Sequence, residues 1–266
     1  MLELKYNDIS SRVKEFDYDH YLCSIFSPSL MRERIVTLNC FNYELSRVRR
    51  SVSDPLLGQI KLQWWRDELV GISKNGSELS GHPLSGMLGE FINRESDQIN
   101  MCISIVMAYQ ENILSPKLIE EKLDGLIQFY ADTWGRLAKL QLNTLGITDE
   151  LTIYVAESIT IGWALMDYIR TATERFSCGI SVVPKDLERH HSLGTCKIST
   201  SKKNSKLCNA VRSISDCSES YLERARSCKL KIDRKALPIL LPMIITQSYL
   251  FNLSKHDFNI FSPHVL

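Results

Sequence analysis

Basic and hydroxyl side chains occupy one helical segment at a spacing that could serve an anion. Residues 41–50 read Phe-Asn-Tyr-Glu-Leu-Ser-Arg-Val-Arg-Arg, and Ser46 lies one helical turn before Arg50 on the same face. An arginine can clamp a phosphate through two parallel hydrogen bonds, but a guanidinium group cannot ligate a metal ion. Arg47 and Arg50 are therefore candidate anion ligands. The alternative for such a basic run is a solvated face paired with nearby acids such as Glu44.

A second group of charged side chains lies near residue 170. Arg170 is a third candidate anion ligand, and Thr171 and Arg175 follow it on the same segment. Asp167 precedes Arg170 by one turn. This acid is expected to pair either locally with Arg170 or with an arginine of the first helix, and the second arrangement would close any cavity between the two helices.

Two neighbouring tryptophans provide candidate contact residues. Trp64 continues the apolar stripe of Leu57 and Ile60, so it is expected in the core. Trp65 points about 100° away on a helix and is the better candidate for contact with a partner protein, because tryptophan is enriched at binding hot spots. Arg66 beside it is a second contact candidate, although a helix surface charge is the simpler interpretation.

Other candidate side chains give weaker signals. Tyr130 and Trp134 are spaced at i and i+4, which could shape an apolar pocket for a ligand such as a lipid, or could simply fill the core. The pair His190 and His191 lacks a further ligand at helical spacing. The eight cysteines contain no Cys-x-x-Cys pair, so they are expected to be reduced thiols that pack as small hydrophobes. These residues predict no metal site.

The composition excludes some classes of partner. With 32 basic and 31 acidic residues the formal net charge is +1, so no global field favours nucleic acid. The first residues, Met-Leu-Glu-Leu-Lys, predict neither a signal peptide nor a transit peptide, and a cytoplasmic location is therefore expected. A chain that is 44% hydrophobic and 24% charged is typical of a globular domain with a substantial core.

The elements that must position these residues are all expected to be helices. Apolar residues recur at steps of three and four along most of the chain, and no alternating strand pattern occurs. Four helix starts are marked by a polar residue followed by proline: Ser27-Pro28, Asp54-Pro55, His82-Pro83 and Ser115-Pro116. We expect eight or nine helices in a single all-α domain that spans residues 1–266.

Local signals predict the boundaries of three helices. Gly71 is expected to end one helix, and Thr148 is expected to cap the start of another. The segment Ala236–Leu253 is the most apolar of the chain, but Pro238 and Pro242 interrupt it. It is therefore expected to be a buried C-terminal helix rather than a membrane span.

Four segments spread over most of the chain resemble the squalene/phytoene synthase family: Tyr18–Val52, Gln63–Leu69, Tyr130–Gly135 and Gly162–Pro184. The resemblance implies an isoprenoid-synthase-type helical bundle with a central cavity. It also implies the chemistry of the family, in which two prenyl diphosphates are joined head to head. In that chemistry, Asp-rich motifs on two helices hold the Mg²⁺ ions that help to ionise the first substrate.

The residues at those motif positions depart from the family pattern. Ser46, Arg47 and Arg50 stand where the first motif has acids, and Thr171 and Arg175 stand where the second has them. Mg²⁺ requires hard oxygen ligands in near-octahedral geometry, so basic side chains cannot replace the carboxylates. The resemblance with these departures predicts a non-catalytic protein that needs no cofactor.

The chain is more similar to a non-catalytic branch of the family, through Tyr43–Arg49, Ser53–Pro55, Gln63–Arg66 and His82-Pro83. This branch implies a role in the assembly of respiratory complex I, with peripheral complex I subunits as partners. It also implies action at the cytoplasmic face of a bacterial inner membrane, with peripheral membrane contact. One alternative is an active prenyl diphosphate transferase that uses arginine clamps and Mg²⁺. Another is a carrier of an isoprenoid or other apolar ligand, which needs only the cavity.

Overall fold

A computed structural model describes the chain at residues 2–52, 54–75, 82–92, 97–115, 120–177, 181–193, 203–228 and 233–262. Within these ranges the chain forms helices joined by turns, and no strand occurs there. The expected all-α class is therefore confirmed. The helices outnumber the eight or nine expected, because short turns and one π-helical segment divide several of the predicted helical stretches.

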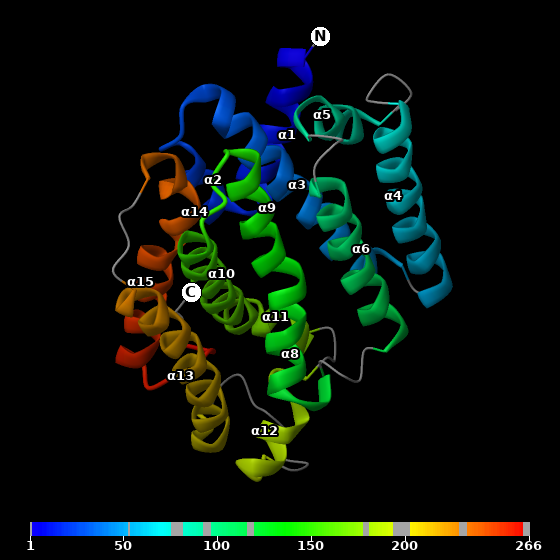
Figure 1. The fold of residues 1–266 in the computed structure, drawn as a ribbon. Helices are drawn as coiled ribbons and strands as arrows, with labels where there is room; N and C mark the ends of the chain where they lie inside the picture. Colours follow the sequence, from blue (N-terminus) through cyan, green and yellow to red (C-terminus); the bar gives the residue numbers. More distant parts are fainter. Residues whose placement is uncertain are drawn as a thin grey trace.

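The helices vary in length from single turns to rods of 23 residues. In chain order, and as labelled in Figure 1, they are α1 (Leu2–Phe16), α2 (Tyr18–Ser24), α3 (Ser29–Ser51), α4 (Pro55–Asn75), α5 (Pro83–Phe91), α6 (Gln98–Leu114), α8 (Leu123–Tyr130), the π-helix η2 (Ala131–Gly135), α9 (Arg136–Thr144), α10 (Glu150–Arg170), α11 (Ala172–Ser177), α12 (Lys185–His190), α13 (Ser205–Ser227), the 3-10 helix η3 (Arg234–Ala236), α14 (Leu237–Leu240) and α15 (Pro242–Lys255).

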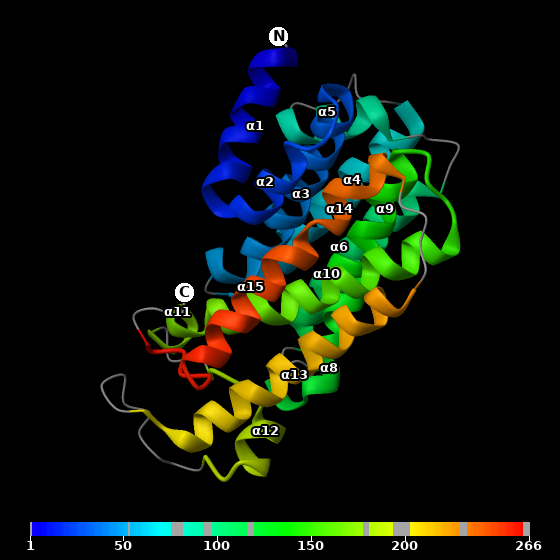
Figure 2. The same cartoon turned by 90° about the vertical axis from the view of Figure 1, so that its left-hand side faces the viewer.

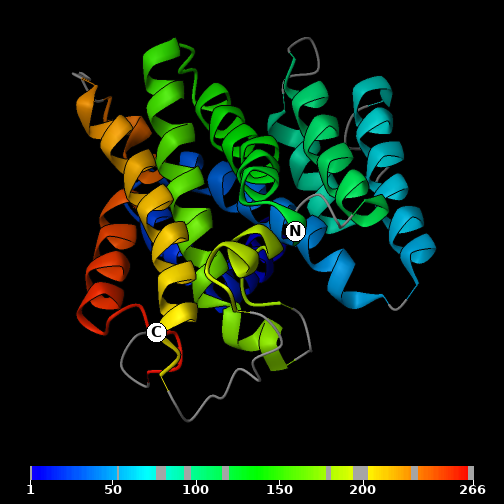
Figure 3. The same ribbon diagram turned by 90° about the horizontal axis from the view of Figure 1, so that it is seen from below.

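Helix α10 is the hub of the bundle, with its most extensive packing against α13. Figures 1 and 3 show α4 and α6 side by side at one edge and α13 with α15 at the opposite edge. Figure 2 shows α14 and α15 lying over α10. Gly162 permits the close crossing of α10 and α13, because a Cβ there would lie 3.1 Å from both Leu222 Cδ2 and the Ser218 carbonyl oxygen. The Ser218 hydroxyl donates a hydrogen bond of 2.7 Å to the Gly162 carbonyl at the same point.

Buried apolar side chains form three clusters. The first lies among α1 and α3 to α6 and includes Phe41 and Leu62. The second joins α10 to α13 and α15 and includes Leu165 and Ile214, while the third lies where α9, α10 and α14 meet, around Ile159. The buried apolar side chains therefore lie on both sides of α10, and the single domain over residues 1–266 stays a prediction.

Two helix boundaries differ from the sequence-based expectation. Helix α1 precedes the first predicted start at Ser27-Pro28, and its Ile9 and Val13 are buried in the first cluster. Helix α4 continues past Gly71 to Asn75. Glycine is tolerated inside a helix at a cost of about 1 kcal/mol relative to alanine, and the packing of the preceding turns outweighs it.

The predicted start signals have mixed outcomes. Asp54 caps α4, because its carboxylate accepts a hydrogen bond of 2.8 Å from the Leu56 amide. Thr148 does not cap α10. Asp149 does so instead by accepting from the Thr152 amide at 3.0 Å. The predicted start at Ser115-Pro116 lies partly outside the described residues.

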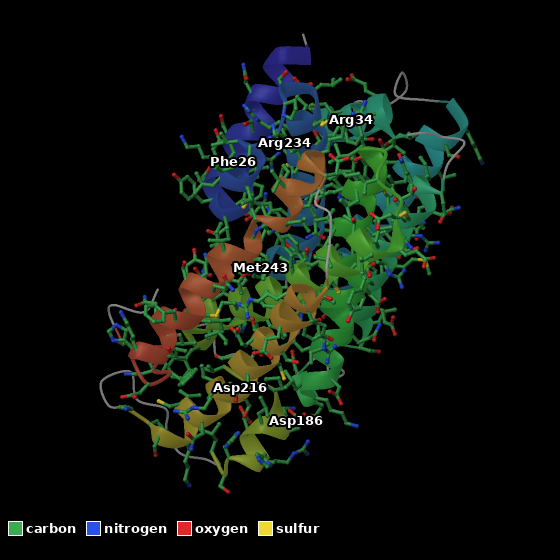
Figure 4. The ribbon with its side chains drawn as sticks, turned by 60° about the vertical axis from the view of Figure 1, so that its left-hand side comes forward. Phe26, Arg34, Asp186, Asp216, Arg234 and Met243 are labelled. Atoms are coloured by element: carbon green, nitrogen blue, oxygen red, sulfur yellow. The ribbon has the colours of Figure 1, made fainter. Side chains whose placement is uncertain are left out.

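The C-terminal helical stretch is half-buried. Within the described residues, Arg234–Lys255 is long and apolar enough to cross a membrane by length and composition, with a mean hydropathy of 1.4. The expectation that it would fall short of this was wrong. However, 44% of its most apolar window is buried inside the protein. Thr246 and Leu253 face the bundle, whereas Ile244 and Phe251 are exposed. Figure 4 shows this stretch running along one face of the molecule.

Candidate functional site

The arginines of α3 pair with different acids. Arg47 Nη1 lies 3.5 Å from Glu44 Oε1, and Arg12 contacts the same carboxylate. Arg50 Nη1 lies 4.0 Å from Glu174 Oε2 on α11, and both of these side chains are exposed. Exposed pairs of this kind contribute about 0–1 kcal/mol. This geometry is that of a solvated, paired face, and anion binding by Arg47 and Arg50 stays a prediction.

The side chains at the other expected motif positions form local hydrogen bonds, although Arg175 Nε is buried without a partner among the described residues. The Ser46 hydroxyl donates to the Tyr43 carbonyl oxygen at 2.8 Å. Arg175 Nη1 donates to Thr171 Oγ1 at 2.8 Å, and its guanidinium group lies 3.6 Å from the centre of the Tyr168 ring. Ser46 and Arg175 are thus each held by contacts close to them in the sequence.

The side chains at the expected motif positions do not fit Mg²⁺. Carboxylate oxygens would be needed, and these positions hold a serine, a threonine and arginines. Glu174 is the acid nearby, and its exposed carboxylate faces Arg50. Across the part of the chain that the structure describes, no three His, Cys, Asp or Glu side chains are grouped to hold a metal ion. No catalytic step through Mg²⁺ follows from these residues.

A buried polar cluster that sequence reasoning missed lies where α2, α10 and α15 meet. Asp19 is at its centre. Asp19 Oδ2 accepts from Arg170 Nη1 at 2.5 Å and from Trp163 Nε1 at 3.3 Å, and Oδ1 accepts from the Tyr249 hydroxyl at 2.9 Å. We call this set the Asp19 cluster: Asp19, His20, Asp167, Arg170 and Tyr249. Arg170 is thus engaged inside the bundle as the ion-pair partner of Asp19.

His20 packs against two indole rings and bonds to a second aspartate. Its ring centre lies 5.1 Å from that of Trp134 and 4.3 Å from that of Trp163, and its Nδ1 lies 3.0 Å from Asp17 Oδ1. Burial lowers the pKa of His20, but the charge and hydrogen bond of Asp17 raise it, and the net shift is upward. The surrounding acids therefore favour the imidazolium form inside the bundle.

Asp167 forms neither of its two expected ion pairs. Arg170 pairs with Asp19, and within the described residues no arginine of α3 lies within 4.0 Å of the Asp167 carboxylate. Burial raises the pKa of Asp167 from 3.8 to about 6, and the nearby charge of Arg170 offsets part of the rise. Asp19 could not be recognised from the sequence, because α2 has only seven residues, too few for a periodic pattern.

Replacing Asp167 with asparagine is expected to stabilise the protein at neutral pH. Between about pH 4 and pH 6 the folded state holds a proton that the unfolded chain has released, so the free energy of unfolding falls as pH rises through this window. The Asp167→Asn variant has no titrating carboxyl at this position, so its free energy of unfolding does not fall in this way. Urea unfolding should show a gain of about 1–3 kcal/mol at pH 7.5 that shrinks towards pH 4. The exposed Asp216 on α13 (Figure 4) gives the control variant, Asp216→Asn, and an equal effect in both variants would contradict the assignment.

The two tryptophans of α4 have the reverse of their expected positions. Trp65 is 5% exposed, and its ring meets the ring of Phe41 edge-on with centres 5.4 Å apart. Trp64 is 41% exposed. The reason is that α4 packs on its neighbours through the face that carries Leu62 and Trp65, so the stripe containing Trp64 points outward. Arg66, the second contact candidate, is partly buried on the same helix.

Tyr130 and Trp134 do not share a pocket. Tyr130 packs against the second apolar cluster and Trp134 against the first. Tyr130 immediately precedes the π-helix η2 and Trp134 lies within it, and the wider turn of η2 shifts the side chains away from the i, i+4 register of an α-helix. Burial raises the pKa of Tyr130 well above its ordinary value, so its hydroxyl stays protonated. Its role as a ligand-binding residue stays a prediction.

The described surface has hollows beside the π-helix and between α3 and α4. One, of 420 Å³, lies beside the π-helix and has polar walls that include Asp97, Ser104, Arg136, Lys139 and Glu157. The other is a groove of 550 Å³ between α3 and α4, and Arg47 of the first motif lies on its wall. We call the second hollow the α3–α4 groove.

Comparison with known proteins places this geometry in a family. The family model described as squalene/phytoene synthase matches residues 13–266. Two solved structures share the fold. A dehydrosqualene synthase in complex with ligand aligns with a TM-score of 0.76 at 12% identity, covering 98% of this chain and 90% of that one. Squalene synthase HpnC from Alicyclobacillus acidocaldarius aligns with a TM-score of 0.77 at 11% identity, covering 97% and 96%. The expected isoprenoid-synthase-type bundle is therefore confirmed.

Relatives with higher sequence identity than these two solved structures are named as assembly factors rather than as synthases. The human protein named NADH dehydrogenase (ubiquinone) complex I, assembly factor 6 is 24% identical over 251 residues, which cover 94% of this chain and 74% of the relative. A homologue of that factor from Dictyostelium discoideum is 22% identical over 259 residues, covering 96% and 72%. The similarity to these relatives thus extends over nearly the whole bundle.

Proposed function

The chain belongs to the squalene/phytoene synthase family, and we propose that within this family it assists the assembly of respiratory complex I and does not join prenyl diphosphates. The observation that carries the proposal is the match to complex I assembly factor 6 from several animals and an amoeba along more than nine-tenths of the chain. The structural neighbours named as synthases share the fold at 11–12% identity.

The side chains at the motif positions support this proposal. Ionisation of a prenyl diphosphate builds negative charge on the leaving group, and metal ions held by carboxylates normally compensate that charge. Here Arg50 and Arg175 occupy motif positions, and each of them is engaged by a neighbouring side chain. A protein that acts through binding has no need of a metal at these positions. Its site of action would be the periphery of the membrane that holds complex I.

The proposal predicts a loss of assembled complex I when the gene is deleted. Native gel electrophoresis of membranes from the source organism should show much less of the assembled enzyme, and the intact gene should restore it. A tagged chain should recover peripheral complex I subunits, identified by mass spectrometry. Normal amounts of assembled complex I in the deletion strain would contradict the proposal.

A direct assay distinguishes the enzymatic alternative. Purified protein is incubated with C15 or C20 prenyl diphosphate and Mg²⁺, with a dehydrosqualene synthase as the positive control. We expect diphosphate release at the rate of a sample without protein. Release that depends on both the protein and Mg²⁺, and that disappears in the Arg50→Ala variant, would establish the prenyl transferase instead.

A further inference from the structure

Helix α4 carries an apolar stripe that the bundle leaves uncovered. Leu57, Ile60 and Trp64 are spaced at i, i+3 and i+7, so they share one face, and they are 50%, 57% and 41% exposed. The opposite face of α4, with Leu62 and Trp65, is buried. A helix that is apolar on two faces normally has partners on both sides. Figures 1 and 3 show α4 at the outer edge of the bundle.

The stripe continues into the α3–α4 groove. Ile60 and Trp64 form part of its wall, together with Val48 from α3 and the edge of Trp65. The hollow is therefore concave and largely apolar, and it lies between two helices. A third helix seated in such a groove follows the ordinary packing of helices, with axes about 8–10 Å apart.

The charges around the groove are not balanced. Glu44 is the acid on its wall, and both Arg12 and Arg47 already contact that carboxylate. Lys61 is exposed, and its Nζ donates a hydrogen bond of 3.3 Å to the hydroxyl of Ser51. Two cations on the wall, Arg47 and Lys61, thus face one anion, Glu44, which Arg12 also contacts from α1. An occupant with carboxylates beside its apolar face would complement both the stripe and the charge.

We propose that the α3–α4 groove binds an amphipathic helix of a protein partner, with apolar residues at i, i+3 or i+4 and i+7 and flanking Asp or Glu side chains. The inference rests on the proposed function in one respect: the helix belongs to a subunit that the chain helps to assemble. The concave shape favours a helix over a flat bilayer surface. Burial of Ile60 and Trp64 supplies the affinity, while Arg47 and Lys61 set the orientation.

The test uses the full chain with a photo-crosslinking amino acid at position 60, expressed in the source organism. Cross-linked peptides are identified by mass spectrometry, and a chain with the same amino acid at Leu151, an exposed leucine on α10, is the control. We expect a cross-link from position 60 to an amphipathic, acid-bearing helix of a complex I subunit. A cross-link to lipid, to a second copy of this chain, or to a segment without acids would overturn the proposal.

Substitutions separate this inference from the proposed function. The Ile60→Asp and Lys61→Glu variants should recover the subunit about tenfold less well than the unmodified chain, whereas Leu151→Asp should recover it normally. Circular dichroism and the unfolding midpoint check that each variant is folded. We expect all of them to fold, because the substituted residues are exposed. If the unmodified chain recovers no complex I subunit, the proposed function fails. If all variants recover it equally, the proposed function stands and the groove is not the binding site.

Discussion

Replacing Arg170 with methionine is expected to lower the free energy of unfolding by about 3–5 kcal/mol, the range for breaking a buried ion pair by removing one partner. The Asp19 carboxylate would lose its charge partner at 2.5 Å while it stays buried between α2 and α10. Tyr249 and Trp163 would still donate to it, but neither carries a compensating charge. Urea denaturation followed by circular dichroism measures the change.

Two further variants show whether the loss comes from the unpaired charge. Arg50→Met removes an arginine from an exposed pair and should cost less than about 1 kcal/mol. The double variant Asp19→Asn with Arg170→Met removes both charges, so its loss should be smaller than the sum of the two single losses. Strict additivity, or an equal loss at Arg50, would show that Asp19 and Arg170 do not act as a pair.

Replacing Gly162 with valine is expected to force α10 and α13 apart and to cost about 3 kcal/mol, the upper part of the range for overpacking. The new Cβ would meet Leu222 Cδ2 and the Ser218 carbonyl oxygen at 3.1 Å, and the branched methyl groups need more room still. Leu222 can adjust its rotamer, but the carbonyl oxygen moves only with the backbone of α13. The hydrogen bond of 2.7 Å from Ser218 to the Gly162 carbonyl would also be strained.

The control for this variant is a glycine with open space around it. Apart from the adjoining backbone of α4 itself, no described atom lies within 4 Å of a Cβ built on Gly71, so Gly71→Ala should raise the free energy of unfolding by about 0.5–1 kcal/mol through helix propensity alone. Thermal and urea unfolding of both variants give the comparison. If Gly162→Val unfolds at the same midpoint as the unmodified chain, the crossing is looser than the structure indicates.

The helical class and the family fold could be predicted because apolar periodicity and motif-like segments are local properties of the sequence. The identity of the buried face on α4 could not. Leu57, Ile60 and Trp64 form as good a stripe as Leu62 and Trp65, so periodicity alone cannot say which one meets the bundle. Sequence reasoning chose the first stripe, and the structure buries the second.

The Asp19 cluster shows a second limit. Arg170 and Asp167 could be predicted as candidates because they lie near a motif-like segment on a long helix. The residues that complete the cluster, Asp19 on α2 and Tyr249 on α15, are far away in sequence. Nothing in a seven-residue helix marks Asp19 as buried rather than exposed. Pairing across 151 residues is a property of the packed bundle. A charge is therefore best assigned to a site only after the packing of all its neighbours is known.

The hydrogen bond between Asp19 and Tyr249 also bears on how the protein is made. It spans 230 positions, so α2 leaves the ribosome long before α15 exists. Until α15 docks, the carboxylate of Asp19 has no hydroxyl donor from Tyr249, and the apolar surface of α10 that α15 covers is open to water. Distant contacts of this kind form late and slowly, and the exposed surface is one that chaperones recognise. Synthesis of α15 is thus required to complete the hydrogen bonding of Asp19, and a chain truncated before α15 would leave this surface of α10 exposed.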